Sequence, residues 1–319
     1  MILKTCKIES IVNFSELPFK DAVVENVVLI VKKTNSEKER ESNVVKFFGV
    51  NEKLLFAKQT EVIQSQFSNN HKKGFNVSLN KESTKLKEKI ENRASPLGNF
   101  LEVNQAIALK ENRAKYLSKD KVSEQYKKVI DGRNIGRYSL SWDGFYLKYD
   151  INVIHSCKRE DIFLTDEKLF FRRVGDRLIA TLDDKQFYAL NTLIVMNKKS
   201  EVKEDVRYFL ALFNSNLINY YYQTFLKSTK KVFSEIQARQ VKVLPIKNGS
   251  EIEQQKINSL VDKMLSLSKH LKELGDKLTD ERAHIEEEIV KTDVEIDNLV
   301  YKVYGITDEE KKVIEDSLK

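Results

Sequence analysis

Positions 22–33 read Ala-Val-Val-Glu-Asn-Val-Val-Leu-Ile-Val-Lys-Lys and are mostly apolar and β-branched, and a polar run follows from Thr34 to Asn43. A run of this kind predicts a buried strand that ends at a surface turn. Residues 8–14 predict a shorter strand, and the segment around Pro18 connects the two. Together they predict a β-hairpin at the edge of a sheet.

Residues 98–247 alternate short apolar segments with turn residues. Glycine and Asp-Gly or Gly-Asp pairs separate these segments, which predicts a mixed, β-rich domain. Its strands are expected at 145–147, 169–173 and 178–181. From Val206 to Phe225 the apolar residues recur at helical spacing, which predicts one or two buried helices with aromatic residues in the core.

The C-terminal part has a period of its own, in which apolar residues advance by three and four alternately and lie on one stripe of a helix. These residues are Ile257, Leu260, Met264, Leu267, Leu271, Leu274 and Leu278. Gly275 offers a stop and Thr279 a new N-cap, so we expect an antiparallel pair of helices packed on the preceding domain. The second helix would present Ile285, Ile289, Ile296, Leu299 and Val303 and end near Gly305.

A charged run at 81–93, closed by Ser95-Pro96-Leu97-Gly98, indicates a domain boundary. We therefore expect an α/β (α+β) protein with four parts: residues 1–80, a linker at 81–97, the β-rich domain at 98–248 and the helical tail at 249–319.

Charge is segregated along the chain. The 319 residues carry a formal net charge of +7, yet residues 250–319 hold 18 Asp and Glu against 11 Lys and Arg, so the rest is strongly basic. A basic body with an acidic helical tail suits a polyanion-binding surface joined to a segment that packs on protein. Ordinary surface charge is the alternative.

Other features narrow the class of protein. No apolar run is long enough for a membrane helix or a signal peptide, so a cytoplasmic protein is expected. Two cysteines and four scattered histidines provide neither a disulfide framework nor metal-ligand spacing, and we expect no bound metal.

Candidate DNA contacts cluster beside the turn at Gly132. Arg133, Asn134, Arg137 and Tyr138 lie within six residues, and Arg can pair with guanine and Asn with adenine in the major groove. The alternative is a structural turn in which Arg137 forms a surface ion pair.

Two further basic groups suit phosphate binding. The first is the run Lys227, Ser228, Thr229, Lys230 and Lys231, together with Arg239. The second consists of Arg172, Arg173 and Arg177, whose positions alternating exposure on a strand explains nearly as well.

Several of these segments resemble one known family. Residues 131–138 resemble the Gly-Arg-Asp-Ile-x-Arg-Tyr element of the TaqI-like C-terminal specificity domain, which supplies target recognition in type IIG restriction-modification enzymes and adenine-specific DNA methyltransferases. Residues 208–216, 233–236 and 243–246 resemble later elements of that domain in the same order. The ending at 293–310 resembles the aspartate-rich tail of the same enzymes.

The resemblance extends to residues 1–80, which are similar to the last strands of that family's methyltransferase domain. It departs from the pattern at 105–110, where a Gln-Gly-Ile-x-Thr-Gly turn is usual. Since DNA in these enzymes lies between the catalytic and recognition domains, the resemblance implies weak, salt-sensitive DNA binding by this part.

The catalytic signature of the family is missing from the sequence. Its Asn-Pro-Pro-Tyr loop would need adjacent prolines, but Pro18, Pro96 and Pro245 are isolated, and no Gly-x-Gly turn follows an N-terminal strand to hold S-adenosylmethionine. The pattern Glu201-Val-Lys203 with Asp183 or Asp184 is the nearest approach to a nuclease site, and lysine-rich turns give it by chance.

We therefore expect sequence-specific DNA target recognition for a restriction-modification methyltransferase, without catalytic activity in this chain. The chain would be the C-terminal part of the enzyme or a separate specificity subunit. Its partners would be double-stranded DNA and a methyltransferase domain or subunit that binds the S-adenosylmethionine. The alternatives are a protein-interaction subunit with little DNA contact, or a non-functional truncated remnant.

Overall fold

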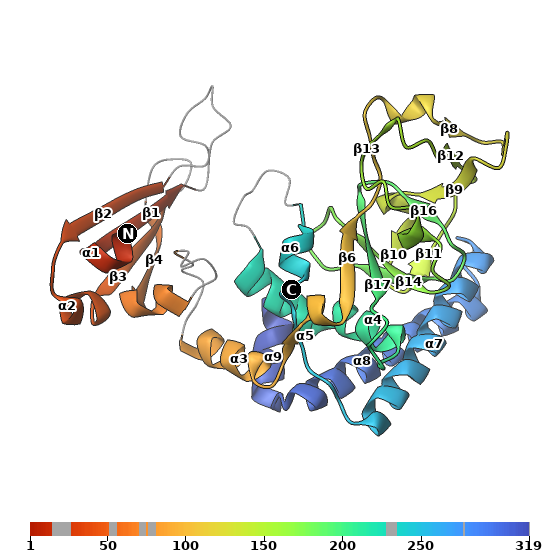
Figure 1. The fold of residues 1–319 in the computed structure, drawn as a ribbon. Coiled ribbons are helices and arrows are strands. Elements are labelled where there is room, and N and C mark those ends of the chain that lie inside the picture. The colour runs from red at the N-terminus through yellow and green to blue at the C-terminus, as the bar shows by residue number, and fades with distance from the viewer. Residues whose placement is uncertain are drawn as a thin grey trace. The chain divides into compact units, whose positions relative to one another are not determined.

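The computed structural model describes residues 1–14, 27–50, 56–69, 75, 81–227, 235–276 and 278–318. The chain divides into two units, and each is described by itself (Figure 1). The first comprises Met1–Lys87 with Thr224–Lys230, and the second comprises Glu88–Gln223 with Lys231–Lys319. The helix α3 (Lys81–Glu91) spans the division in sequence.

The first unit is built on a four-stranded sheet in the order β2-β1-β3-β4. Its strands are β1 (Cys6–Phe14), β2 (Val27–Lys33), β3 (Val44–Val50) and β4 (Phe56–Ile63). β1 pairs with β2 antiparallel and with β3 parallel, and β2 lies at the edge of the sheet. This confirms the predicted antiparallel pair at a sheet edge, although its connecting segment lies outside the described residues.

The core of this unit consists of Ile8, Ile11, Val45, Val62 and Phe67. In the described part of this unit, short helices accompany the sheet: α1 (Ile2–Thr5), α2 (Glu37–Glu41) and the 3₁₀ helix η1 (Gln64–Asn69). Phe67 on η1 is fully buried, and Ile2 and Leu3 on α1 pack against the same cluster.

The prediction of a buried strand at 22–33 is wrong for the residues described. Val27, Val28, Ile30 and Val31 are between 40% and 58% exposed on β2, and Leu29 packs partly against the core. β-branched residues favour a strand, but whether the strand is buried depends on what covers it. β2 therefore presents an exposed apolar edge.

The second unit contains two four-stranded sheets. One has the order β15-β14-β17-β6, with β6 (Leu101–Gln105), β14 (Lys168–Arg172), β15 (Ala180–Asp183) and β17 (Leu193–Lys198). The other has the order β16-β9-β12-β8, with β8 (Leu117–Ser118), β9 (Tyr126–Ile130), β12 (Tyr146–Lys148) and β16 (Tyr188–Ala189). Strands therefore form at all three predicted positions, each within two residues of its expected bounds.

Short two-stranded ladders complete the β-rich part. They are formed by β5 (Ser95–Pro96) with β18 (Pro245–Ile246), β7 (Ala108–Leu109) with β13 (Ile154–Ser156), and β10 (Ile135–Gly136) with β11 (Ser139–Leu140). The 3₁₀ helices between them are η3 (Leu97–Asn99), η4 (Arg113–Lys115), η5 (Gly132–Asn134) and η6 (Asp161–Phe163). One apolar cluster, which includes Ile107, Leu147, Phe163, Phe170 and Val195, joins several of these elements.

The segment 206–225 forms two helices, as predicted, because Ser215 interrupts the first and caps the second. α4 (Val206–Asn214) is buried at all but one position, and α5 (Asn216–Tyr221) continues into one turn of π-helix at Tyr222–Leu226. The Ser215 hydroxyl accepts a hydrogen bond from the backbone N–H of Ile218, which starts α5. A short helix α6 (Ala238–Val241) follows later in the chain.

The tail confirms the antiparallel helical pair. α7 (Glu251–Leu274) begins with a capping box between Ser250 and Glu253, and α8 (Asp280–Tyr304) begins at Thr279 and ends at Gly305 in the left-handed conformation. Ion pairs from Lys302 to Glu253 and from Lys263 to Glu288 join the two helices near one end and near their middles.

Two details of the tail differ from the prediction. Leu278 is 96% exposed because the first helix has already ended at Leu274, so the apolar stripe stops one step earlier. A third helix, α9 (Asp308–Ser317), was not predicted, although Thr307 and Glu310 form a capping box at its start.

The helical pair packs on the β-rich part through α4 and α5 (Figure 1). α7 lies along α4, and α8 and α9 contact α5. Within the described residues, no helix is long and apolar enough to cross a membrane.

Candidate nucleic-acid interface

The turn that follows β9 is organised by Asp131. Its carboxylate accepts hydrogen bonds from the backbone N–H of Arg133 (2.9 Å) and from the guanidinium of Arg133. In return, the side-chain oxygen of Asn134 accepts a bond from the backbone N–H of Asp131 at 2.7 Å. This reciprocal capping box fixes the turn and leaves the Arg133 side chain 72% exposed.

Asn134 is buried and has a structural role in this arrangement. Its amide nitrogen donates to the carboxylate of Asp143, while its oxygen is already bonded to Asp131. Tyr138 is also buried, at 2% exposure, and burial raises the pKa of its phenol. Neither side chain offers a polar group to DNA as the chain is folded here.

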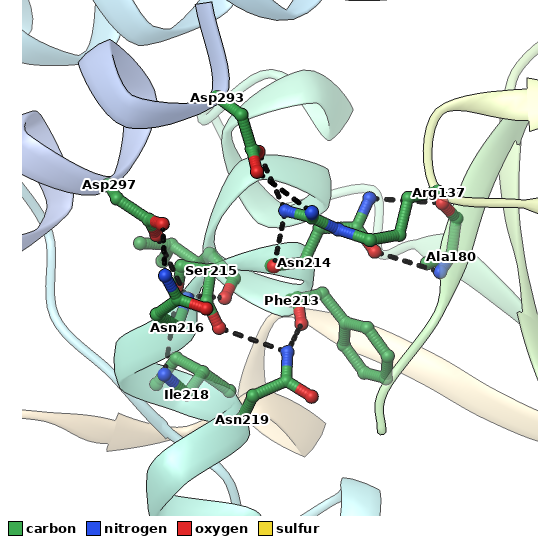
Figure 2. Close-up of polar contacts among 11 residues, drawn as sticks. Arg137, Ala180, Phe213, Asn214, Ser215, Asn216, Ile218, Asn219, Asp293 and Asp297 are labelled. Carbon is green, nitrogen blue, oxygen red and sulfur yellow. Dashed lines mark hydrogen bonds and ion pairs between the residues drawn. The ribbon is translucent and has the colours of Figure 1, made fainter. Parts of the chain in front are cut away.

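Arg137 is bound to the tail, and its side chain stays 36% exposed. Its guanidinium donates to both carboxylate oxygens of Asp293 on α8, at 2.8 and 2.6 Å, and to the carbonyl of Asn214 at 3.0 Å (Figure 2). Burial opposes the charge of Arg137, but the bonds and charge of Asp293 outweigh it and raise the pKa of Arg137. The ion-pair alternative for Arg137 therefore describes the structure.

The Asn-Ser-Asn segment between α4 and α5 continues the same junction. Asn214 bonds both the N–H and the carbonyl of Ala180 on β15, at 2.9 and 3.0 Å. Asn216 donates its backbone N–H and its amide to the two carboxylate oxygens of Asp297, at 2.8 and 2.7 Å (Figure 2). Burial raises the pKa of Asp297 to about 7.

Three arginines gather around one shallow concavity, which we call the arginine groove. Arg113, Arg133 and Arg172 line it together with Asp131, Gly132, Val174 and Thr192, and its volume is about 390 Å³. Arg113 pairs with a carboxylate oxygen of Asp131 at 3.2 Å and is 50% exposed. The groove therefore carries three guanidinium charges against one carboxylate.

Electrostatics keep Asp131 ionised in this groove. Burial would raise the pKa of its carboxyl, but the bonds from Arg133 and the charges of Arg133 and Arg113 lower it. Arg172 donates to the carbonyl of Ile135, and the N–H of Gly132 donates to the Thr192 hydroxyl at 2.9 Å. The guanidinium positions are thus set by the β9–β10 turn and by the sheet.

The other predicted contact residues are dispersed. Arg173 is 18% exposed and bonds the carbonyl of Asn191 and the carboxylate of Glu235. Arg239 lies on α6, and Lys227 follows the π-helical turn. Ser228, Thr229, Lys230 and Lys231 lie outside the described residues.

Sequence reasoning identified Arg133 and Arg172 separately and missed Arg113 and Thr192. Arg113 reaches the groove by pairing with Asp131, which lies 18 positions away, and no spacing rule connects them. The structure also places Asp183, one of the nuclease candidates, in a buried ion pair with Lys168 at 2.8 Å. Among the described residues, no three His, Cys, Asp or Glu side chains group as a metal site.

The chain is similar to a known protein family and to a curated relative. Residues 127–246 match the family described as the TaqI-like C-terminal specificity domain, and this segment includes the turn at Arg133, the Arg137 junction and α4 to α6. The chain is 25% identical over 305 residues to "Putative type II restriction enzyme and methyltransferase RM.MjaORFECS2P" of Methanocaldococcus jannaschii. This match covers 90% of the chain and 24% of that relative, so the chain spans about a quarter of its length.

Among solved structures, the fold is similar to the Type IIL restriction-modification enzyme MmeI in complex with DNA. The TM-score is 0.56 at 10% sequence identity, over 95% of this chain and 44% of that one. This likeness is one of fold. Since it covers 95% of the chain, it extends to both sides of residues 127–246, the segment matched by the family.

Proposed function

We propose that this chain, whose residues 127–246 match the TaqI-like C-terminal specificity domain, recognises the DNA target of a restriction-modification methyltransferase. It would act as the C-terminal part of such an enzyme or as a separate specificity subunit. The observation that carries the proposal is the arginine groove, which lies within or beside the matched segment and exposes Arg113 and Arg133.

The groove has the chemistry that a DNA contact needs. A guanidinium is planar, permanently charged and presents five N–H donors, which suit a phosphate or the O6 and N7 atoms of guanine. The described bonds of Arg133 to Asp131 use Nε and Nη2, and that of Arg113 uses Nη1. Each side chain keeps further donors for DNA while Asp131 fixes its position.

A salt titration of duplex DNA binding tests this proposal. Each phosphate contact contributes about 0.9 to the slope of log affinity against log salt. We expect Arg113→Ala and Arg133→Ala each to weaken binding, and each to flatten the slope by about 0.9 if its guanidinium contacts a phosphate. A residue that reads a base would instead lose affinity at an unchanged slope.

The matched control is Arg159→Ala. Arg159 is 52% exposed and pairs with Glu102 and Asp161, but it does not line the groove. It should leave affinity and slope close to those of the unchanged chain. If the double variant at Arg113 and Arg133 binds as tightly and with the same slope as the control, the groove is not a DNA contact.

We also propose that the chain has no methyltransferase activity and does not bind S-adenosylmethionine alone. The support is the sequence, in which adjacent prolines and a Gly-x-Gly turn after an N-terminal strand are absent. Calorimetry should show no saturable heat with S-adenosylmethionine. Binding at micromolar concentration would contradict the proposal.

The methyltransferase partner would join the first unit at β2. This edge strand exposes Val27, Val28, Ile30 and Val31, and an apolar edge readily accepts another strand. The relative of the chain is named as a methyltransferase and is about four times as long as the matched part. We infer that strands of a catalytic domain continue the sheet here.

Co-purification with a methyltransferase encoded beside this chain tests the partner proposal. Replacing Val28 and Ile30 by Lys should abolish co-elution, because lysine side chains on an edge strand oppose pairing with a further strand. Replacing Lys38 by Glu on the short helix α2 provides a control. Co-elution that survives the first change and is lost in a chain that ends at Asn248 would place the partner on the tail instead.

That second outcome would favour a protein-interaction subunit. The observation behind it is a groove of about 600 Å³ between α7 and α8, lined by Ile252, Leu260 and Leu299, with Ile252 66% exposed. In that case DNA binding would be minor and independent of the arginine groove.

A further inference from the structure

The exposed face of the sheet β16-β9-β12-β8 carries a regular set of tyrosines and lysines. β9 and β12 pair antiparallel, with Tyr146 opposite Lys128 and Lys148 opposite Tyr126. Directly paired residues share a face, so these four side chains lie together. We call them the tyrosine–lysine face. On the other side of the sheet, Val129 and Leu147 are buried in the core.

Trp142 extends this face and is itself firmly held. Its ring contacts that of Tyr146 edge-on at 5.1 Å between centroids, and the Lys128 ammonium lies 4.9 Å from its centroid. Its indole N–H donates to the carbonyl of Phe145 at 2.8 Å, and the ring packs partly against the core cluster. The aromatic surface is therefore fixed in position before any ligand arrives.

The two lysines of this face carry exposed positive charges. Lys128 and Lys148 are exposed, and neither takes part in an ion pair within the described part of the chain. The rings of Tyr126, Tyr146 and Trp142 are half-buried. Exposed cations placed between partly exposed rings suit a ligand that combines negative charge with a flat ring.

We propose that the tyrosine–lysine face binds an unpaired nucleotide of a DNA strand, with a base stacked on the rings and phosphates beside the lysines. Bases in an intact duplex are covered on both faces by their neighbours, so stacking on protein requires an unpaired base. The inference rests on the proposed function in taking DNA as the ligand. It adds a second contact of a different kind.

The position of the face relative to the arginine groove supports this ligand. β9 carries Tyr126 and Lys128 and runs directly into Asp131 and Arg133. At about 3.3 Å per residue, Lys128 lies about 17 Å or less along the chain from Arg133. A strand that leaves a duplex held at the groove can therefore reach the face within a few nucleotides.

Trp142 allows a direct test because it is the single tryptophan of the 319 residues. Titrating the full chain with a short oligothymidylate should quench Trp142 emission in a saturable way, because a base would stack beside its ring. A fully paired duplex of the same length should change the emission much less.

Matched variants then separate stacking from charge. Replacing Tyr126 and Tyr146 by Ala should weaken oligothymidylate binding by about 5-fold to 150-fold for each base that stacks. Replacing both by Phe should retain the affinity because the rings remain. Replacing Lys128 and Lys148 by Ala should flatten the salt slope by about 0.7 for each lost phosphate contact, as measured by the anisotropy of a labelled oligonucleotide.

Three results would overturn the inference: an unchanged Trp142 emission at saturating oligothymidylate, equal affinity of the Ala pair and the unchanged chain, or equal quenching by the intact duplex. The proposed function is judged separately, by duplex binding of the Arg113 and Arg133 variants. Loss of duplex binding in those variants with intact oligothymidylate binding would show the two contacts to be distinct and would support both.

Discussion

Arg137 and Asp293 lie 156 positions apart in the chain, yet two hydrogen bonds of 2.8 and 2.6 Å join them into one bidentate ion pair. Arg137 belongs to the turn that resembles the TaqI-like specificity domain, and Asp293 opens the segment that resembles the ending of the enzymes that carry this domain. The two segments therefore meet at a junction between the β-rich part and α8. We infer that this pair sets how the recognition surface is held on the helical tail.

Arg137→Ala should lower the free energy of unfolding by about 2 kcal/mol, because a hydrogen bond to a charged group contributes about 1.5 to 3 kcal/mol. Urea denaturation would measure it. In a double-mutant cycle with Asp293→Asn, the two changes should be coupled rather than additive. If the two losses of unfolding free energy simply add, the interaction between Arg137 and Asp293 contributes nothing to stability.

Arg159→Ala serves as the control for that measurement. Its ion pairs with Glu102 and Asp161 are on the surface, where such pairs contribute about 0 to 1 kcal/mol. If Arg159→Ala lowers the free energy of unfolding as much as Arg137→Ala does, the effect at Arg137 cannot be assigned to its place at the junction with α8.

The pH dependence of stability should report on Asp297. Its pKa of about 7 in the folded chain lies above the value of about 3.9 for an unfolded Asp, so the folded state holds the proton more tightly. The contribution of Asp297 to the free energy of unfolding is therefore fully present at low pH. It declines as the pH rises from about 4 to 7, by up to about 1.4 kcal/mol per pH unit.

Asp297→Asn cannot titrate and should lack this contribution. Urea unfolding at a series of pH values across that window should show the stability of the unchanged chain falling relative to the variant as pH rises. Parallel curves for the two proteins would refute the raised pKa.

The buried pair Lys168–Asp183 leads to a third expectation. Lys168 also donates to the carbonyl of Phe163, and the N–H groups of Lys185 and Phe187 donate to Asp183, so both charges are well bonded. Lys168→Met would leave a buried carboxylate without its cation and should cost about 3 to 5 kcal/mol. Combining Lys168→Met with Asp183→Asn should recover much of that loss in urea denaturation; no recovery would assign the cost to packing alone.

Local patterns in the sequence predicted much of the fold. The period of three and four, with Gly275 and Thr279 between, predicted the α7–α8 pair. The helical spacing at 206–225 predicted one or two buried helices, and α4 and α5 are the two that form. The exposure of β2 could not be predicted, because the same β-branched run serves an interior or an edge strand. Whether such a strand is buried or exposed depends on which other elements of the fold cover it.

The candidate site was harder to predict for a physical reason. Asn134 and Arg137 have the donor chemistry of DNA-reading residues, but Asp143 and Asp293 already take those donors. Motif reasoning does not identify such partners in advance, because the fold alone brings them together. Arg113 joins the groove through Asp131 in the same way, so its role emerges only in three dimensions.

The lysine-rich run after α5 stays a prediction, since Lys230 and Lys231 lie outside the described residues. Replacing both by Ala should flatten the salt slope of duplex binding by about two units if both contact phosphates. An unchanged slope would remove this run from the DNA surface and leave the arginine groove as the main cationic contact.

Selection from a pool of randomised duplexes tests the central claim most directly. The full chain is incubated with the pool at moderate salt, and the bound DNA is amplified and sequenced over several rounds, with the Arg113→Ala, Arg133→Ala double variant in parallel. We predict that one short motif is enriched by the unchanged chain and lost or relaxed with the variant. Binding without enrichment of any motif would contradict target recognition by this chain.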